Sequence, residues 1–210
     1  MNPTLCLASA SPRRRELLAQ IGVPHALARA DIDETALAEE TPRDYVTRMA
    51  QEKARVVWAR VSGGGSADAA GVISGRDALP VLAADTIVVL DGTIYGKPRD
   101  RQHALEMLGR LSARTHEVLT AVALAHVGGV GLKLSVSSVK FRALSPEEIE
   151  AYWETGEPRD KAGGYAVQGL GAVFIESIAG SYSGVMGLPL FETAELLRSA
   201  GLPQWCRMQG

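Results

Sequence analysis

The sequence predicts an α/β domain with a mixed central sheet flanked by helices. Segments typical of strands alternate along the 210 residues with segments whose apolar residues recur at helical spacing. Two pairs of strand segments are joined by short turns that contain glycine, which is typical of antiparallel hairpins. Parallel strands need a long crossover connection, so these hairpins indicate a mixed sheet and not a purely parallel one. At this length we expect one domain over residues 1–210.

The N-terminal segment predicts a strand at residues 4–8 followed by a helix. Ser11 suits the N-cap of that helix, and Pro12 suits its first position, where no backbone N–H is needed. Apolar residues then recur at helical spacing, and Gly22 ends the helix. A short extended stretch is expected at residues 23–30.

A second, longer helix is predicted over residues 41–61, where the sequence reads "TPRDYVTRMAQEKARVVWARV". Thr41 suits its N-cap and Pro42 its first position, and Asp44 follows Thr41 by three residues as in a capping box. The small, glycine-rich segment at about 62–78 predicts a flexible surface loop. Periodic structure resumes directly after it, so the loop interrupts the domain without dividing it.

The rest of the chain predicts strands and helices in alternation. The pair Asp91-Gly92 in "IVVLDGTIY" suits a type I′ hairpin turn, and Ser145 with Glu148 forms a capping-box pattern. The expected elements in order are a strand at 81–84, the hairpin at 87–95, a helix at about 104–111, strands at 117–127 and 132–144 joined by a turn at 128–131, a helix from 145 to about 155, a strand at 171–180 and a helix between 189 and 200.

Composition excludes several classes of protein. The formal net charge of −2 does not fit a protein that binds nucleic acid or a membrane surface through bulk positive charge. The two cysteines form no disulfide framework: Cys6 is expected to be a buried thiol, and Cys206 lies in the tail. No signal peptide or long apolar stretch is present, so we expect a cytoplasmic protein.

Three consecutive arginines, Arg13, Arg14 and Arg15, stand at the predicted start of the first helix. A cation there is disfavoured by roughly 0.3–1 kcal/mol, because the helix N-terminus carries partial positive charge. Three neighbours cannot share one helix face, so one or two could project over the N-terminus. Guanidinium groups and free helix amides together form a cradle for phosphate or carboxylate. The alternative is a solvated basic turn.

Asp85 lies in "ADT" between the apolar runs "VLA" and "IVVL". A buried aspartate needs a partner or a metal, or its pKa rises. We interpret it as a general base or metal ligand at a strand end, and the alternative is a hydrogen-bonded turn aspartate. Lys53 starts on the inward face of its helix, where it either reaches out to solvent or meets a phosphate. Lys97 is directed by its neighbours Gly96 and Pro98.

Seven glycines cluster within residues 160–190, where aromatic and apolar residues are too frequent for a flexible linker. We expect the glycines to permit close approach of the backbone to a ligand, with a buried Gln168 reading the edge of a base. No P-loop, strand-linked GxGxxG or zinc motif is present. Together these features favour a nucleotide over a sugar or peptide.

Four segments resemble, in order, the sequence blocks of the Maf family of nucleoside triphosphate pyrophosphatases: "LASASPRRRELL", "ADTIVVLDGTIYGKPRD", "DKAGGYAVQG" and "GSYSGVMGLPL". With the "QEKA" helix they span nearly the whole chain. The resemblance implies an inosine-triphosphate-pyrophosphatase-like α/β fold and hydrolysis of the α–β phosphoanhydride with a divalent metal, Mg²⁺ or Mn²⁺. The products would be a nucleoside monophosphate and pyrophosphate.

The resemblance also assigns roles to matching positions. Asp85 matches the catalytic aspartate that activates water. Positions linked to substrate choice carry Arg13, Thr86 and Gln168, as in the branch that acts on dTTP and UTP; the 7-methyl-GTP branch tends to carry Trp, Gln and Glu there. Further expected roles are metal binding for Glu34 with Asp85, and phosphate binding for Ser11, Arg14, Lys53 and Lys97.

Two features depart from the family pattern: Gly164 replaces a more usual alanine, and the loop at 62–78 is long. The resemblance implies a homodimer. It leaves two alternatives open, a nucleotide-binding regulator of septum formation and a 7-methyl-GTP pyrophosphatase.

Overall fold

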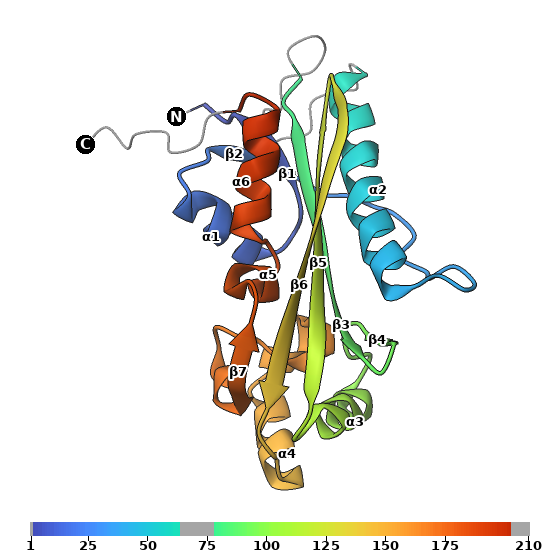
Figure 1. Ribbon diagram of the computed structural model, residues 1–210, viewed down its shortest axis with the longest axis vertical. Helices are drawn as coiled ribbons and strands as arrows, with labels where there is room; N and C mark the ends of the chain where they lie inside the picture. Colours follow the sequence, from blue (N-terminus) through green and yellow to red (C-terminus); the bar gives the residue numbers. More distant parts are fainter. Residues whose placement is uncertain (1, 64–77, 203–210) are drawn as a thin grey trace.

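One mixed sheet runs the length of the molecule (Figure 1). The computed structural model describes residues 2–63 and 78–202, and the seven strands in that part follow the order β2-β1-β3-β5-β6-β7, with β4 paired to β3. The pairs β1–β2 and β1–β3 are parallel and the other pairs are antiparallel, which confirms the predicted mixed sheet. The strands are β1 (Leu5–Ala8), β2 (His25–Ala28), β3 (Val81–Leu90), β4 (Thr93–Tyr95), β5 (Thr115–His126), β6 (Gly129–Phe141) and β7 (Ile175–Ala179).

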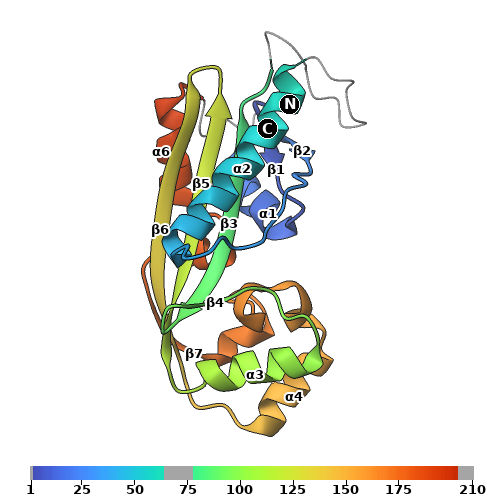
Figure 2. The same cartoon turned by 90° about the vertical axis from the view of Figure 1, so that its right-hand side faces the viewer.

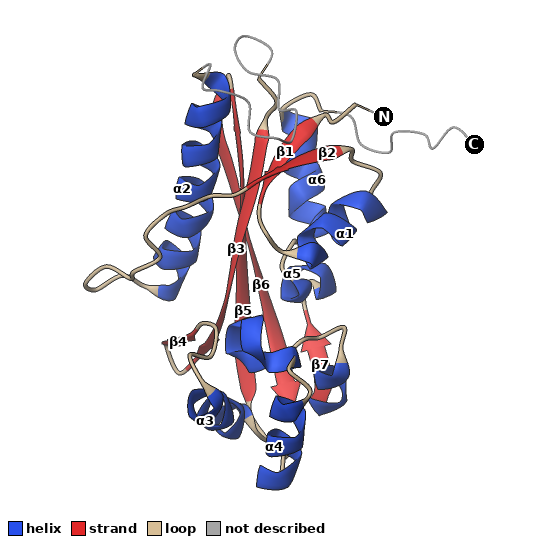
Figure 3. Ribbon diagram, turned by 180° about the vertical axis from the view of Figure 1, so that it is seen from behind, coloured by secondary structure: helices blue, strands red, loops and turns tan. Residues whose placement is uncertain are grey.

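Helices cover both faces of the sheet and one end of it. The α-helices are α1 (Pro12–Gln20), α2 (Pro42–Ser62), α3 (Arg101–Leu111), α4 (Pro146–Glu154), α5 (Tyr182–Met186) and α6 (Leu190–Ser199). The 3-10 helices are η1 (Glu157–Asp160), η2 (Ala162–Gly164) and η3 (Leu170–Phe174). Seen from behind, α2 lies on one side of the sheet and α1, α5 and α6 lie on the other (Figure 3).

Two lobes share the long strands β3, β5 and β6 (Figure 2). The upper lobe contains β1, β2, α1, α2 and α6, and the lower lobe contains β4, β7, α3, α4 and the 3-10 helices. In the upper lobe one apolar core lies between α2 and the sheet, and a second lies between the sheet and α1 with α6. A third core fills the lower lobe around Phe141 and Tyr165. On the sheet face opposite α2, the second and third cores are separated by a polar level that contains Thr86 and Thr120.

Strand β3 crosses that polar level. Its residues are buried except for Asp85 and Thr86 in the middle, which are partly exposed. Side chains alternate across a sheet, so Asp85 shares the face covered by α2, and Thr86 the opposite face. Along the face of Thr86, Leu82 belongs to the core under α1 and Val88 to the core of the lower lobe. The prediction that Asp85 ends a strand is therefore wrong, because hydrogen bonding to β5 continues past it.

Local sequence signals at turns and caps are confirmed. Asp91 and Gly92 both have positive φ, 51° and 75°, as a type I′ turn requires. The side chain of Thr41 accepts from Asp44 N at the start of α2. Ser145 and Glu148 form a complete capping box at the start of α4.

Two expectations about element boundaries are corrected, and one helix was not predicted. The segment predicted as a strand over 171–180 begins as the 3-10 helix η3, and only Ile175–Ala179 is a strand. The turn expected at 128–131 is shorter, because β6 already starts at Gly129. The short helix α5, with Ser181 as its N-cap, was not expected.

Cys6 is a buried free thiol, as predicted. The glycine-rich loop expected at about 62–78 lies outside the described residues, apart from its ends, and so does Cys206. Among the described helices, none combines the length and apolarity needed to span a membrane.

Candidate active site

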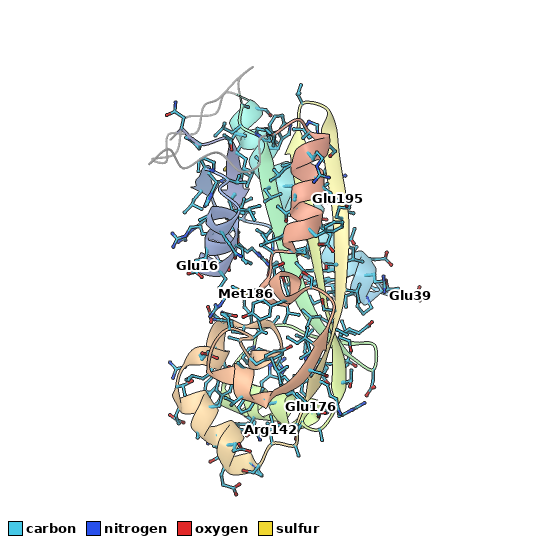
Figure 4. The ribbon with its side chains drawn as sticks, turned by 60° about the vertical axis from the view of Figure 1, so that its left-hand side comes forward. Glu16, Glu39, Arg142, Glu176, Met186 and Glu195 are labelled. Carbon is cyan, nitrogen blue, oxygen red and sulfur yellow. The ribbon has the colours of Figure 1, made fainter. Side chains whose placement is uncertain are left out.

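A cleft of about 690 Å³ opens between the two lobes. Met186 on α5 lines it and marks the level where the lobes meet (Figure 4). Every residue for which the sequence predicted a site role lines this one cleft: Ser11, Arg13, Arg14, Glu34, Lys53, Asp85, Thr86, Lys97 and Gln168. These side chains come from α1, α2, β3 and loops far apart in the sequence.

The cleft lies at a notch in the edge of the sheet. The parallel partner β1 last pairs with β3 at Leu7–Leu82, and the antiparallel partner β4 first pairs with it at Val88–Tyr95. Between these points β3 is paired on its other edge only, with β5. Asp85 and Thr86 lie on this open stretch, with their side chains on opposite faces of the sheet. Both side chains line the same cleft, because no neighbouring strand covers this edge of β3.

Lys53 joins the two carboxylates of the cleft. Its Nζ lies 2.7 Å from Oδ1 of Asp85 and 2.6 Å from Oε1 of Glu34. The side chains of Lys53 and Asp85 are only 12% and 14% exposed, so this ion pair is largely removed from water. Burial raises the pKa of Glu34, but the positive charges of Lys53, Lys97 and Arg14 lower it by more. The pKa of Glu34 is therefore below its ordinary value.

The loop that carries Glu34 is fastened to α2. The hydroxyl of Tyr45 donates to the carbonyl oxygen of Glu34 at 2.9 Å. Arg48 donates to the carbonyl oxygen of Thr35 at 3.0 Å and to both carboxylate oxygens of Glu40. The position of Glu34 therefore depends on α2 as much as on its own loop.

Arg14 holds three parts of the cleft together. Its Nε donates to the carbonyl oxygen of Gly187 at 2.7 Å, Nη1 to Ser9 Oγ at 3.3 Å and Nη2 to Thr86 Oγ1 at 3.1 Å. Burial lowers the pKa of Arg14, and the nearby Asp85 and Glu34 act in the opposite direction. Thr86 also meets the buried Thr120, whose hydroxyl lies 3.0 Å away.

Arg13 and Gln168 meet across the cleft, one from each lobe. With the amide oriented to satisfy its neighbours, Oε1 of Gln168 accepts from Nη2 of Arg13 at 2.9 Å and also from its Nε. The prediction that Gln168 is buried is wrong, since its side chain is exposed at the rim of the cleft. Arg15 is exposed as well and is not among the residues that line the cleft.

The start of α1 and Lys97 complete the polar lining. Ser11 is the N-cap of α1, but its side chain makes no capping hydrogen bond. The first helical turn borders the cleft through Ser11, Pro12 and Arg13, so its free N–H groups lie where an anion could bind. Lys97 is exposed at the same cleft and lowers the pKa of Glu34.

The glycines of residues 160–190 serve a purpose different from the one expected. A Cβ on Gly163 would lie 2.7 Å from Cγ2 of Val88, and one on Gly180 would lie 2.7 Å from Oγ of Ser137. These positions exclude side chains because the protein itself packs against them, not because a ligand approaches. Of these seven glycines, only Gly187 lines the cleft, and a Cβ on it would lie 3.5 Å from Thr86 Oγ1.

A divalent cation fits the arrangement of the two carboxylates. Glu34 and Asp85 converge on a single positive group, the ammonium of Lys53. Mg²⁺ is commonly held by one or two carboxylates together with phosphate oxygens and water. Within residues 2–63 and 78–202 no group of three or more His, Cys, Asp or Glu side chains could hold a metal. A metal here would therefore depend on oxygen atoms of a phosphate ligand.

Several cleft residues were not singled out from the sequence. Asp160 and Lys161 enter from the lower lobe, and Arg29 and Tyr45 from the upper lobe. The adjacent charges in "DKAGG", next to the glycine-rich segment, were the available signal for Asp160 and Lys161. Arg29 and Tyr45 carry no comparable local signal, since only the tertiary fold brings them to the cleft.

Comparison with known proteins matches the sequence to one family. Residues 4–200 match the model of the family described as "Maf-like protein". The chain is 53% identical to a dTTP/UTP pyrophosphatase of Nitrosomonas europaea, with 93% of this chain and 94% of the relative covered. Proteins of the same name from Alkalilimnicola ehrlichii and Methylococcus capsulatus are also 53% identical, covering 93% and 94% of this chain and 92% and 91% of the relatives.

Proposed function

The chain belongs to the Maf-like protein family, and we propose on this premise that it hydrolyses dTTP and UTP to the nucleoside monophosphate and pyrophosphate. Relatives that share about half of its residues over nearly the whole chain carry that activity in their names. The observation that carries the proposal is the Glu34–Lys53–Asp85 arrangement at the open edge of β3, beside the uncapped start of α1. It puts a carboxylate base next to groups that bind phosphate.

Asp85 acts on the attacking water. Its carboxylate orients a water molecule toward the α-phosphorus and takes its proton, while the bond from that phosphorus to the bridging oxygen breaks and pyrophosphate leaves. Lys53 holds this carboxylate in place through the contact of 2.7 Å. Catalysis in this scheme is largely a matter of positioning and electrostatic stabilisation.

Glu34 and Asp85, with phosphate oxygens, would hold a divalent metal, Mg²⁺ or Mn²⁺. When bound, such a metal neutralises charge on the phosphate oxygens and on the leaving pyrophosphate. Lys53, Lys97, Ser11 and the first-turn N–H groups of α1 supply the remaining positive and hydrogen-bonding groups for the triphosphate. Arg14 adds its charge to the cleft and keeps Thr86 and Gly187 in place.

Base selection depends on Arg13, Thr86 and Gln168. Because Oε1 of Gln168 accepts from Arg13, the amide NH₂ remains as a donor at the cleft. Thymine and uracil present the carbonyl oxygen O4 as an acceptor, whereas cytosine presents an amino group at the same place. A donor on Gln168 therefore suits dTTP and UTP and disfavours CTP.

Pyrophosphate release by the purified protein tests the proposal. The panel is dTTP, UTP, CTP, GTP and 7-methyl-GTP, each with Mg²⁺ or Mn²⁺ and with a chelator as the control. We expect release mainly from dTTP and UTP, and none with the chelator. A preference for 7-methyl-GTP would refute the assignment of Arg13, Thr86 and Gln168. Tight binding of UTP without any release would refute the enzyme and favour a nucleotide-binding regulator.

We further propose that the chain works as a single domain, as a homodimer and in the cytoplasm. Exposed apolar side chains on the described surface, among them Phe191 at 71% and Val173 at 67% exposure, are available for contact between copies. Sedimentation analysis of the purified protein tests the homodimer, with a monomeric mass as the contrary result.

A further inference from the structure

We propose that Tyr152 and Glu157 form a clamp that positions Gln168, and that this clamp is a determinant of base selectivity. Neither residue reaches the nucleotide in this scheme. Both act through the backbone of the segment that carries Gln168, residues 166–171. The inference rests on the proposed pyrophosphatase function and extends it from the residues that face the base to those that hold them.

Four hydrogen bonds define the clamp. The hydroxyl of Tyr152 donates to Oε1 of Glu157 at 2.7 Å and accepts from the backbone N–H of Ala166 at 3.2 Å. Oε1 and Oε2 of Glu157 accept from the backbone N–H groups of Gly171 at 3.0 Å and Leu170 at 2.9 Å. The segment is thus held at both ends.

Gln168 lies between the two held ends. Its exposed side chain reaches Arg13 on the opposite lobe. Its neighbour Val167 is buried, so the segment is also anchored by packing next to Gln168. A shift of either end would move the amide of Gln168 relative to Arg13, and therefore the donor that it presents to the base.

Two glycines allow the clamp to close. A Cβ on Gly169 would collide with the carboxylate of Glu157, and one on Gly171 would lie 2.6 Å from the hydroxyl oxygen of Tyr152. Neither glycine has positive φ, so the requirement here is for space and not for an unusual backbone conformation. The segment and the clamp are therefore closely fitted to each other.

The clamp is fixed to the core of the lower lobe. Tyr152 is only 5% exposed, and its ring packs edge-on against Phe174 with centroids 4.9 Å apart. Burial raises the pKa of Glu157, but the hydrogen bonds from Gly171, Tyr152 and Leu170, together with the charge of Arg13, lower it by more. The pKa of Glu157 is therefore below its ordinary value. An ionised carboxylate accepts all three of these hydrogen bonds at once, which a carboxamide cannot do.

Tyr152→Phe tests the clamp because it keeps the ring and removes the hydroxyl. We expect the ratio of kcat/KM for dTTP to kcat/KM for dCTP to fall about fivefold, the size of effect that follows when one hydrogen bond is misplaced. KM for dTTP should rise while kcat changes less, since Asp85 and Lys53 are untouched. The matched control is Tyr182→Phe, which removes the hydroxyl of a half-exposed tyrosine outside the clamp.

A double-mutant cycle with Gln168→Ala shows whether the effect passes through Gln168. In the Gln168→Ala background, Tyr152→Phe should leave the dTTP-to-dCTP ratio unchanged. An equal loss of selectivity in both backgrounds would overturn the inference. A lowered melting temperature with unchanged selectivity in Tyr152→Phe would also overturn it, because the clamp would then be merely structural.

Glu157→Gln provides a second variant in case Tyr152→Phe does not fold, and its control is Glu154→Gln, which changes an exposed carboxylate at the end of α4. The carboxamide NH₂ of glutamine is a donor and would face the backbone N–H donors of the segment, so at least one of these hydrogen bonds is lost. The same loss of selectivity is therefore expected. Wild-type protein is assayed in parallel. If the wild type releases no pyrophosphate, the proposed function fails and the clamp with it, whereas an active wild type with fully selective variants refutes the clamp alone.

Discussion

Nζ of Lys53 lies 2.7 Å from Oδ1 of Asp85, and this contact joins helix α2 to strand β3 in the wall of the cleft. Both side chains are largely shielded from water. A carboxylate that is shielded from water needs a partner of opposite charge or hydrogen-bond donors. The ion pair therefore links the packing of α2 against the sheet to the charge that the proposed chemistry needs.

We expect Asp85→Asn to remain folded and to lose turnover by about 10²–10⁴-fold, because the amide has the shape of the carboxylate but cannot accept a proton. Pyrophosphate release and a thermal melt measure the two effects. Asp91→Asn is the control, since Asp91 lies in an exposed type I′ turn that asparagine also suits. Near-normal turnover of folded Asp85→Asn would contradict the assigned role.

Glu34→Gln tests the proposed metal site. Removing one of two carboxylates should raise the Mg²⁺ concentration needed for half-maximal activity about tenfold or more, with a smaller loss of activity at saturating Mg²⁺. The control is Asp31→Asn, an exposed carboxylate earlier in the same loop. Titrations of the activity of both variants with Mg²⁺ measure this concentration. An unchanged Mg²⁺ requirement in Glu34→Gln would show that Glu34 does not bind the metal.

His116 should make stability depend on pH. It is buried beside Tyr165, whose hydroxyl lies 2.8 Å from Nε2, and burial lowers the pKa of His116 to about 4. The unfolded chain binds the proton at a pKa of about 6.5. The contribution of His116 to the free energy of unfolding is therefore fully present above pH 6.5. It is lost as the pH drops toward 4, by up to ~3 kcal/mol at about 1.4 kcal/mol per pKa unit.

Urea unfolding at pH 7.5 and pH 4.5 measures this loss. His116→Gln should lose less stability between the two values than the wild type, because the group that titrates is gone. The control His126→Gln changes a partly exposed histidine and should retain the wild-type dependence. Identical pH dependence in wild type and His116→Gln would show that other groups govern the acid sensitivity.

Local signals in the sequence were sufficient for most elements. Thr41-Pro42, Asp91-Gly92 and Ser145 with Glu148 each specify a cap or turn through a few neighbouring residues, and each is found as expected. The segment at 171–174 was predicted as the start of a strand because its apolar run satisfies a strand pattern. It becomes a 3-10 helix because Glu157, distant in sequence, accepts from the N–H groups of Leu170 and Gly171.

Site residues were easier to identify than their surroundings. Asp85 stands out as a carboxylate in an apolar run, but the sequence could not reveal that β3 continues through it while β1 stops earlier. The glycines of 160–190 suggested a ligand because glycine signals close approach without naming the partner. Val88, Ser137 and Tyr152 are the partners of three of them, and all three come from other elements.

Gly163→Ala should destabilise the fold by about 2–4 kcal/mol. Its φ of +70° is costly for alanine, and the added Cβ would lie 2.7 Å from Cγ2 of Val88. Gly109→Ala is the matched control, because a Cβ there meets no atom within 4 Å. It lies inside α3, where alanine should stabilise by about 0.5–1 kcal/mol. Chemical denaturation measures both, and equal effects would contradict the packing argument.

The three neighbouring arginines should give three different results when each is changed to methionine. Arg15→Met should leave activity and stability near wild type, because Arg15 is exposed. Arg14→Met should lower the free energy of unfolding by about 1–3 kcal/mol, since the carbonyl oxygen of Gly187 loses a donor and the hydroxyl of Thr86 loses one of its two partners. Its activity should fall as well.

Arg13→Met should keep wild-type stability and change selectivity instead. Without Arg13, Oε1 of Gln168 loses the donor that orients the amide NH₂ toward the base, so discrimination between dTTP and dCTP should weaken. Melting temperatures and kcat/KM for the two nucleotides separate the three variants. If Arg13→Met and Arg14→Met behaved alike, the different contacts of these two side chains would have no functional meaning. The basic segment would then act only through its total charge.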